Sequence, residues 1–197
     1  MPGQGDAGDR GARRPGGGGG KPIPRRTGGL SLRRLGGNDF EFIHPRCVEE
    51  MELDYVEGIE IRQAGDPEGA RDALRYALQG CGDNIWVHNA LGRIALEDFR
   101  DPGLARGHFG YAFELAQRAI PADFSGRLPR DRVPNRPFYE AVDGLATCYE
   151  SLGKPEEAGP LRALAARLGG GGGADRPRGR GTPDGPQGGS RNRGARR

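Results

Sequence analysis

The sequence predicts an all-α fold in which three helix-turn-helix hairpins form a short solenoid. The first observation is a repeat: Gly58 returns as Gly92, and Asp66-Pro67 returns as Asp101-Pro102, roughly 34 residues later. The second observation is a shared pattern of small and large apolar residues after each Asp-Pro pair. It consists of Ala70, Leu74 and Ala77 in the first copy and of Ala105, Phe109 and Ala112 in the second. Self-similarity at this period is typical of stacked helical hairpins.

The composition divides the chain of 197 residues into three parts. Most of the 37 glycines and 16 prolines lie near the two ends, and the formal net charge is +3. Residues 1–37 carry eight Lys/Arg against two Asp/Glu, and residues 169–197 carry seven against two. Residues 38–168 carry fifteen against twenty-three and are therefore acidic. We expect a helical repeat domain at 38–168 between two disordered basic tails, 1–37 and 169–197.

The basic tails have two interpretations. All but two of the thirty basic residues are arginines, which fits the codon bias of a GC-rich genome. The same tails could instead bind nucleic acid through phosphate contacts, although their Arg blocks lack the interleaved aromatics that stack on bases. An RNA-associated protein that uses these tails is therefore the alternative function.

The first half of the domain shows clear boundary signals. Residues 39–45 alternate apolar and polar side chains, which predicts an extended segment lying on a surface. From Arg46 the apolar residues recur every three to four positions, which predicts a helix ending at Gly65. Asp66 and Pro67 are a helix N-cap and a first-turn proline, so a second helix should run to about residue 79.

The second half repeats these signals around an insertion. We expect a third helix at about 84–98 and a fourth from Asp101-Pro102 to just before Pro121. Residues 120–137 hold four prolines and four arginines, so they should form no regular helix and act as a connector or a functional loop. A fifth helix should follow at about 138–152 and a sixth at 155–168, kinked or delayed by Pro160.

This spacing resembles the tetratricopeptide repeat, which has an aromatic residue, Leu-Gly and Tyr in its first helix and Ala, Phe and Ala in its second. The middle unit matches best, with His88, Leu91, Gly92, Ala95, Ala105, Phe109 and Ala112. The outer units depart from the pattern at Asp54, Glu57 and Arg162, where the family has apolar residues. The additional solvating helix that usually ends such arrays has no counterpart after Leu168.

The resemblance implies that the solenoid is right-handed. It also implies a non-enzymatic protein–protein interaction adaptor that holds a peptide segment of a partner on its concave face. We expect this segment to be acidic or mixed in charge. Spacing on the first helices gives the candidate peptide-binding residues Tyr55, Ile59, Arg62, Trp86, Asn89 and Arg93. The alternative is that Tyr55, Ile59 and Trp86 pack between helices. The Lys/Asn/Arg clamp of chaperone-binding members is absent from the matching positions.

The sequence shows no pattern for catalysis, a cofactor or a metal. His44 and Cys47 are the one close pair among His44, Cys47, Cys81, His88 and His108, whereas a structural zinc site needs paired ligands at both ends. Three irregularly spaced cysteines do not make a disulfide framework and fit a reducing compartment. No apolar run is long enough for a signal peptide or a membrane span, so we expect a cytoplasmic protein.

Overall fold

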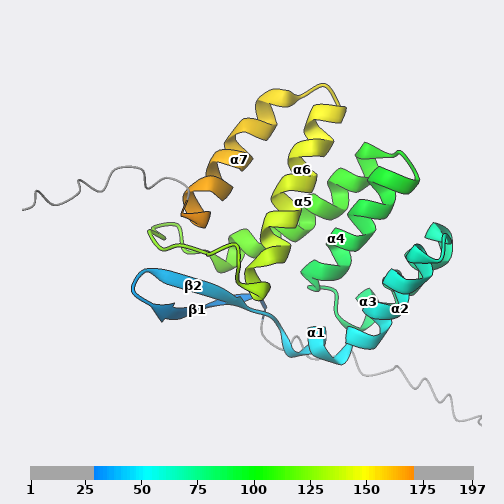
Figure 1. Ribbon diagram of the computed structural model, residues 1–197, viewed down its shortest axis with the longest axis horizontal. Helices are drawn as coiled ribbons and strands as arrows, with labels where there is room; N and C mark the ends of the chain where they lie inside the picture. Colours follow the sequence, from blue (N-terminus) through cyan, green and yellow to red (C-terminus); the bar gives the residue numbers. More distant parts are fainter. Residues whose placement is uncertain (1–28, 171–197) are drawn as a thin grey trace, which may run out of the picture.

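The computed structural model describes residues 29–170, which form a mostly helical protein with a small two-stranded sheet (Figure 1). The chain enters through β1 (Ser31–Gly36) and β2 (Asp39–Ile43). The α-helices are α1 (Arg46–Glu50), α2 (Glu52–Gln63), α3 (Pro67–Gly80), α4 (Ile85–Arg93), α5 (Pro102–Ala119), α6 (Arg136–Ser151) and α7 (Pro155–Gly169). A π-helical turn, η1 (Ile94–Asp98), extends α4, and a 3-10 turn, η2 (Val133–Asn135), precedes α6. The expectation of helices is confirmed, whereas the sheet was not predicted.

The helices pack in consecutive pairs, α2 with α3, α4 with α5 and α6 with α7, and α6 also contacts α4 and α5 (Figure 1). Glycine allows the close approach in the first two pairs. A Cβ on Gly58 would come within 2.7 Å of Leu74, and a Cβ on Gly92 within 2.8 Å of the Phe109 ring. The recurring glycine thus marks the point where the helices of a pair are closest.

The expected helix starts are confirmed at the two Asp-Pro pairs. Gly65 adopts a left-handed conformation with φ of +91°, which reverses the chain after α2. The Asp66 carboxylate then accepts a hydrogen bond from the Gly69 N–H at 2.8 Å. Asp101 accepts one from the Leu104 N–H at 2.9 Å in the same way. These caps satisfy N–H groups that have no partner inside the helix.

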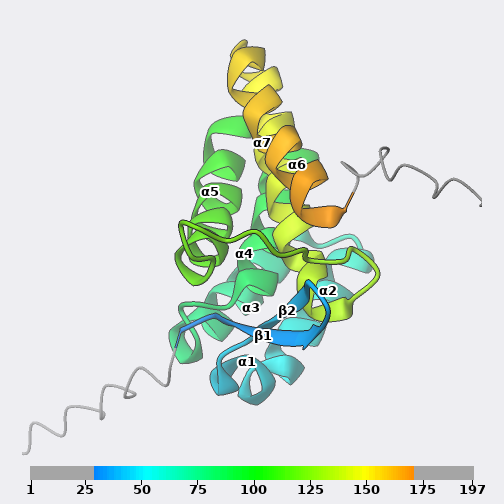
Figure 2. The same ribbon diagram turned by 90° about the vertical axis from the view of Figure 1, so that its left-hand side faces the viewer.

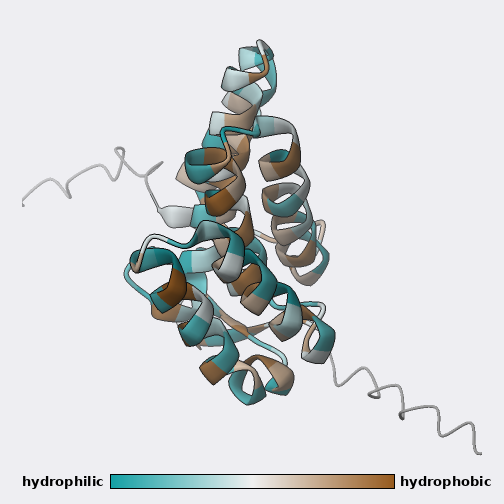
Figure 3. Cartoon of the chain, turned by 90° about the vertical axis from the view of Figure 1, so that its right-hand side faces the viewer, coloured by the Kyte–Doolittle hydropathy of each residue, from teal (hydrophilic) through white to brown (hydrophobic). Residues whose placement is uncertain are grey.

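The surface of α2 is an edge of the helical array. Gly58 is its one fully buried residue, whereas Leu53 is 84% exposed. Figure 3 views the molecule from this side and shows apolar residues interleaved with polar ones on the outer helices. The buried apolar residues form two clusters. One lies between α3 and α4, with α2 packed against it, and the other is formed mainly by α5, α6 and α7 and includes Phe42 of β2.

The hairpin corrects the expected start of the ordered region. Residues 31–36, placed in the N-terminal tail by composition, form β1 and pair antiparallel with β2, with Leu32 opposite Phe42. The extended segment expected at 39–45 is confirmed over residues 39–43, which form β2. Phe42 is 2% exposed, so the hairpin is held to the helices by a core side chain. Residues 1–28 and 171–197, the remainder of the two expected tails, lie outside the described part of the chain.

The Pro/Arg-rich insertion at 120–137 contacts both the hairpin and α7 (Figure 2). The Arg127 N–H donates to the Asn38 carbonyl at 2.7 Å, and the Phe40 N–H donates to the Arg127 carbonyl at 2.8 Å. The Leu128 N–H donates to the Leu168 carbonyl, near the end of α7, at 2.7 Å. The insertion therefore ties the hairpin to the last helix, which favours the connector interpretation.

Asn135 completes this junction. Its side chain is fully buried; its Oδ1 accepts from the Phe42 N–H at 3.0 Å, and its Nδ2 donates to the Phe40 and Pro129 carbonyls at 3.1 Å each. A single amide thus satisfies three backbone groups from β2 and the insertion. Buried backbone groups need such partners because the loss of their hydration is costly.

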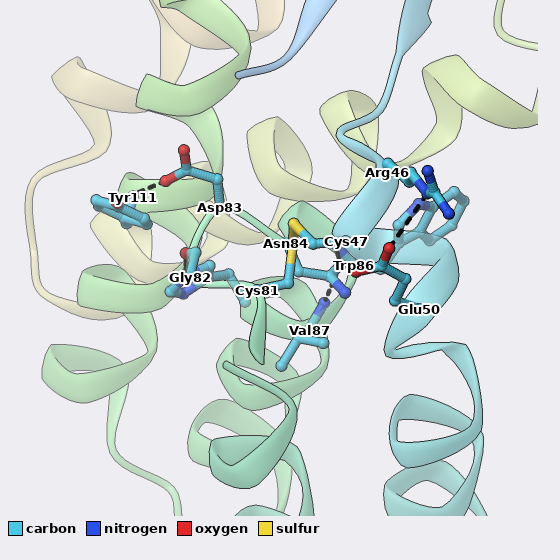
Figure 4. The surroundings of a disulfide bond; sticks show 11 residues. Arg46, Cys47, Glu50, Cys81, Gly82, Asp83, Asn84, Trp86, Val87 and Tyr111 are labelled. Atoms are coloured by element: carbon cyan, nitrogen blue, oxygen red, sulfur yellow. Dashed lines mark hydrogen bonds and ion pairs between the residues drawn. A yellow bond between two sulfur atoms is a disulfide. The ribbon is translucent and has the colours of Figure 1, made fainter. Parts of the chain in front are cut away.

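The cysteines differ from the expectation that all three are reduced. Cys47 of α1 and Cys81, which follows α3, form a disulfide with a Cα–Cα distance of 5.4 Å (Figure 4). Cys148 is free and buried, and it behaves as the expected small apolar side chain. Within residues 29–170, no helix is long and apolar enough to cross a membrane.

Candidate functional site

The candidate residues lie on α2 and α4, and these two helices form one face of the protein together with α6. Arg93 of α4 lies 3.7 Å from the carboxylate of Glu140 on α6. Burial raises the pKa of Tyr55 on α2, and the nearby Arg93 guanidinium opposes this shift. The side chains of Tyr55 on α2 and Arg93 on α4 are therefore close to each other.

A pocket of about 320 Å³ opens at one end of this face. Its lining residues come from α1, α2 and the start of α4, and they are Val48, Glu49, Glu52, Tyr55, Asn84 and Trp86. The Asn84 side chain accepts from the N–H groups of Trp86 and Val87 at 3.1 and 3.3 Å. This cap fixes Trp86 in the first turn of α4, where its partly exposed indole forms a wall of the pocket.

His44 supports Trp86 from the hairpin side. The two rings have a centroid separation of 5.9 Å, and His44 Nε2 lies 2.9 Å from the Pro134 carbonyl. Burial lowers the pKa of His44, so its imidazole is neutral at pH 7. The indole of Trp86 thus packs against an uncharged imidazole.

Arg62 and Ile59 have structural partners instead of an open position on the face. Arg62 makes ion pairs of 2.6 and 2.7 Å with Glu97 and Asp98, which belong to the π-helical turn after α4. Ile59 is partly buried against the cluster formed by α3 and α4. These two residues join α2 to its neighbours, so the packing interpretation accounts for Ile59.

Asn89, another peptide-binding candidate, does not reach the surface of the face. It is fully buried, and its Nδ2 donates to the Pro137 carbonyl at 2.7 Å. Its Oδ1 finds no hydrogen-bond partner among residues 29–170. The start of α6 packs over this part of α4. Asn89 therefore lies on the side of α4 that faces the next helix pair, and that pair covers it.

Beside the candidates Tyr55 and Trp86, the structure places Val48, Glu49, Glu52 and Asn84 around the pocket. Asn84 was expected only as the start of a helix, and the short helix α1 was merged with α2. A sequence signal for the proximity did exist, because Cys47 and Cys81 are separated by 34 residues, the period of the repeat. Residues one period apart occupy equivalent positions on neighbouring units and lie side by side.

A second groove runs between α5 and α7. One part has a volume of about 540 Å³ and the next about 500 Å³, and the two share Glu114 and Gln117. Its charged lining residues are mixed in sign: Arg106, Glu114, Arg118, Glu157 and Arg167. This groove is larger than the pocket at Trp86, but its charges favour no particular ligand.

A histidine cluster lies on the other side of α4. The His88 ring is 4.6 Å from the Tyr111 ring and 5.8 Å from the His108 ring. Burial lowers the pKa of His108 to about 4 and also lowers the pKa of His88. Both imidazoles are therefore neutral at pH 7. Among residues 29–170, no group of three or more His, Cys, Asp or Glu side chains is arranged to hold a metal ion.

Comparisons with family models, curated proteins and solved structures yield no match for this chain. The tetratricopeptide resemblance accordingly rests on the residue pattern described above. The function has to be argued from the geometry of the site.

Proposed function

We propose that residues 29–170 form a non-enzymatic protein-interaction module in which the three helix pairs are tetratricopeptide-like repeats of a short right-handed solenoid. The module binds a peptide segment of a partner protein on the face formed by α2, α4 and α6. The observation that carries the proposal is the pocket at the end of this face, where Tyr55 and Trp86 are both partly exposed.

Two properties of the face support this function. Trp, Tyr and Arg are the residue types that dominate interface energetics, and Trp86, Tyr55 and Arg93 lie on two adjacent helices. Helices also hold these side chains more rigidly than loops would, which reduces the entropy lost on binding. Glu49 and Glu52 take the place of Asn89 and Arg62 in this revised site.

The test is selection of peptides from a random display library on the immobilised full chain. Selected peptides are then titrated against wild type, Trp86→Ala and Tyr76→Ala, where Tyr76 is a 60% exposed aromatic on α3 that does not line the pocket. We expect wild-type affinity for Tyr76→Ala and at least about tenfold weaker binding for Trp86→Ala. Equal affinity of all three proteins would refute the proposed face.

The alternative function, RNA binding through the Arg-rich tails, concerns segments outside the described residues. It stays a prediction, and salt distinguishes it from binding to the face. Tail-driven binding should weaken steeply between about 50 and 200 mM salt because it releases counterions from the nucleic acid. The cytoplasmic location also stays a prediction, and the cysteines no longer support it since two of them are paired.

A further inference from the structure

The pocket at Trp86 combines aromatic walls with carboxylates. Trp86 and Tyr55 contribute aromatic surface, and Glu49 and Glu52 are both exposed at its edge. An aromatic face attracts a cation through its negative quadrupole, and a carboxylate accepts charge-assisted hydrogen bonds from it. We infer that this pocket binds an arginine or lysine side chain in a basic segment of the partner, an assignment that rests on the proposed function.

The local charges favour a cation because the nearby arginines already have partners. Arg46 pairs with Glu50 at 3.2 Å (Figure 4), and Arg93 pairs with Glu140 at 3.7 Å. Glu49 and Glu52 form no ion pair with any residue between 29 and 170. In the described part of the chain, the pocket therefore has two negative charges without an ion-pair partner beside two aromatic rings.

The wider surface has the same sign. Between Cys47 and Ile61 the chain has six acidic residues and no Lys or Arg. They are Glu49, Glu50, Glu52, Asp54, Glu57 and Glu60. A basic segment would be attracted to this surface before it engages the pocket, whereas the acidic segment expected from the sequence would be repelled. The inferred basic segment thus differs from the acidic or mixed segment expected from the sequence.

The disulfide holds the two walls of this pocket together. Helix α1, which contributes Val48 and Glu49, has five residues and none of them is fully buried. Cys47 bonds it to Cys81, whose carbonyl accepts from the N–H of Asn84 at 3.2 Å on the opposite wall (Figure 4). Reduction would release α1 from the start of α4 and widen the pocket. Affinity for the basic segment should therefore depend on the oxidised state.

Trp86 is the single tryptophan of the chain, so its fluorescence reports on the pocket directly. The probes are a synthetic peptide of alternating Arg and Gly and its Glu-Gly counterpart, each titrated into the full chain at low salt. The arginine peptide should produce a saturable change in emission and the glutamate peptide none. The absence of a saturable change with the arginine peptide would overturn the inference.

Charge variants separate recognition in the pocket from general attraction. The double variant Glu49→Gln/Glu52→Gln should weaken binding of the arginine peptide about tenfold or more. The control Glu57→Gln/Glu60→Gln removes the same charge from exposed positions of α2 outside the pocket and should weaken binding less than threefold, about 0.6 kcal/mol. Equal effects of the two double variants would overturn the assignment of the cation to this pocket.

Reductant tests the role of the disulfide. Reduction of the wild-type chain should weaken binding of the arginine peptide several-fold, and Cys47→Ser should bind weakly whether or not reductant is present. Affinity that is unchanged by reduction would refute the bracing role. If library peptides selected through Trp86 are acidic or uncharged, the cation assignment fails while the proposed binding face stands.

Discussion

Replacing Gly92 by Ala should destabilise the protein although Ala is the better helix former. The added Cβ would lie 2.8 Å from the Phe109 ring, closer than carbon atoms approach in folded proteins. The ring has no room to retreat, because a Cβ on Gly144 would meet its other side at 2.5 Å. Phe109 is therefore held between α4 and α6. In the Gly92→Ala variant, α4 would have to move away from α5 to make room for the added Cβ.

The expected magnitude follows from two opposing effects. Overpacking costs about 1–3 kcal/mol, and the clamped ring places this site in the upper part of that range. The gain in helix propensity offsets about 0.5–1 kcal/mol, which leaves a net loss of about 1–2 kcal/mol. At about 2–4 °C per kcal/mol, the melting temperature should fall by about 2–8 °C.

The matched control is Gly107→Ala, an exposed position in α5 where an added Cβ would meet nothing within 4 Å. This variant should have only the benefit of the higher helix propensity of Ala, which stabilises the protein by about 0.5–1 kcal/mol. Thermal and urea denaturation of both variants measure the two effects. A melting temperature for Gly92→Ala at or above that of wild type would refute the close packing of α4 on α5.

Three further outcomes are expected. Burial lowers the pKa values of His88 and His108, the latter to about 4. The stabilisation that depends on their neutral forms should therefore be fully present above the unfolded His pKa of 6.5 and should be lost as the pH falls toward 4. His108→Asn should flatten this decline in a urea denaturation series. Burial raises the pKa of the Cys148 thiol to about 11, so iodoacetamide should label no cysteine in the native chain. It should label one cysteine after unfolding, and three after unfolding with reductant. Labelling of the native chain would contradict the burial of Cys148 or the presence of the disulfide. Asn135→Ala leaves the buried Phe42 N–H without its acceptor and should cost at least about 1–3 kcal/mol, whereas a loss below about 0.5 kcal/mol in chemical denaturation would count against the junction.

The helices could be predicted from sequence because their signals are local. Asp66 and Asp101 cap helices within three residues of their own positions, and Gly65 adopts the left-handed conformation that a helix end requires. Gly92 recurs one period after Gly58 because both lie where paired helices touch. Each of these signals depends on a few neighbouring residues, so the sequence displays it without knowledge of the fold.

The hairpin could not be predicted because its stabilising partners are distant in the chain. Strand β1 contains Arg33 and Arg34 at its centre and has no fully buried residue, so its own composition indicates little. It is ordered through β2, whose Phe40 and Phe42 N–H groups donate to the Arg127 carbonyl and to the Asn135 side chain. Phe42 and Asn135 are 93 residues apart in the sequence. No local pattern contains that information.

Only part of the candidate site could be predicted, because helical periodicity gives the face on which a residue lies but not the element that covers that face. Helical periodicity correctly assigned Tyr55, Trp86 and Arg93 to neighbouring helices. It also assigned Asn89 to the same face, but periodicity does not show that α6 covers this position. The acidic character of the pocket depends on which carboxylates are neutralised by arginines, and that pairing is a property of the tertiary structure.

Hydrogen exchange on the complex tests the central claim most directly. Exchange rates would be measured by mass spectrometry on the full chain, free and saturated with a library-selected peptide. The account predicts slower exchange in residues 46–63 and 84–93, which form the pocket and the face around it. Slower exchange confined to residues 102–119 and 155–169, the two walls of the α5–α7 groove, would contradict it.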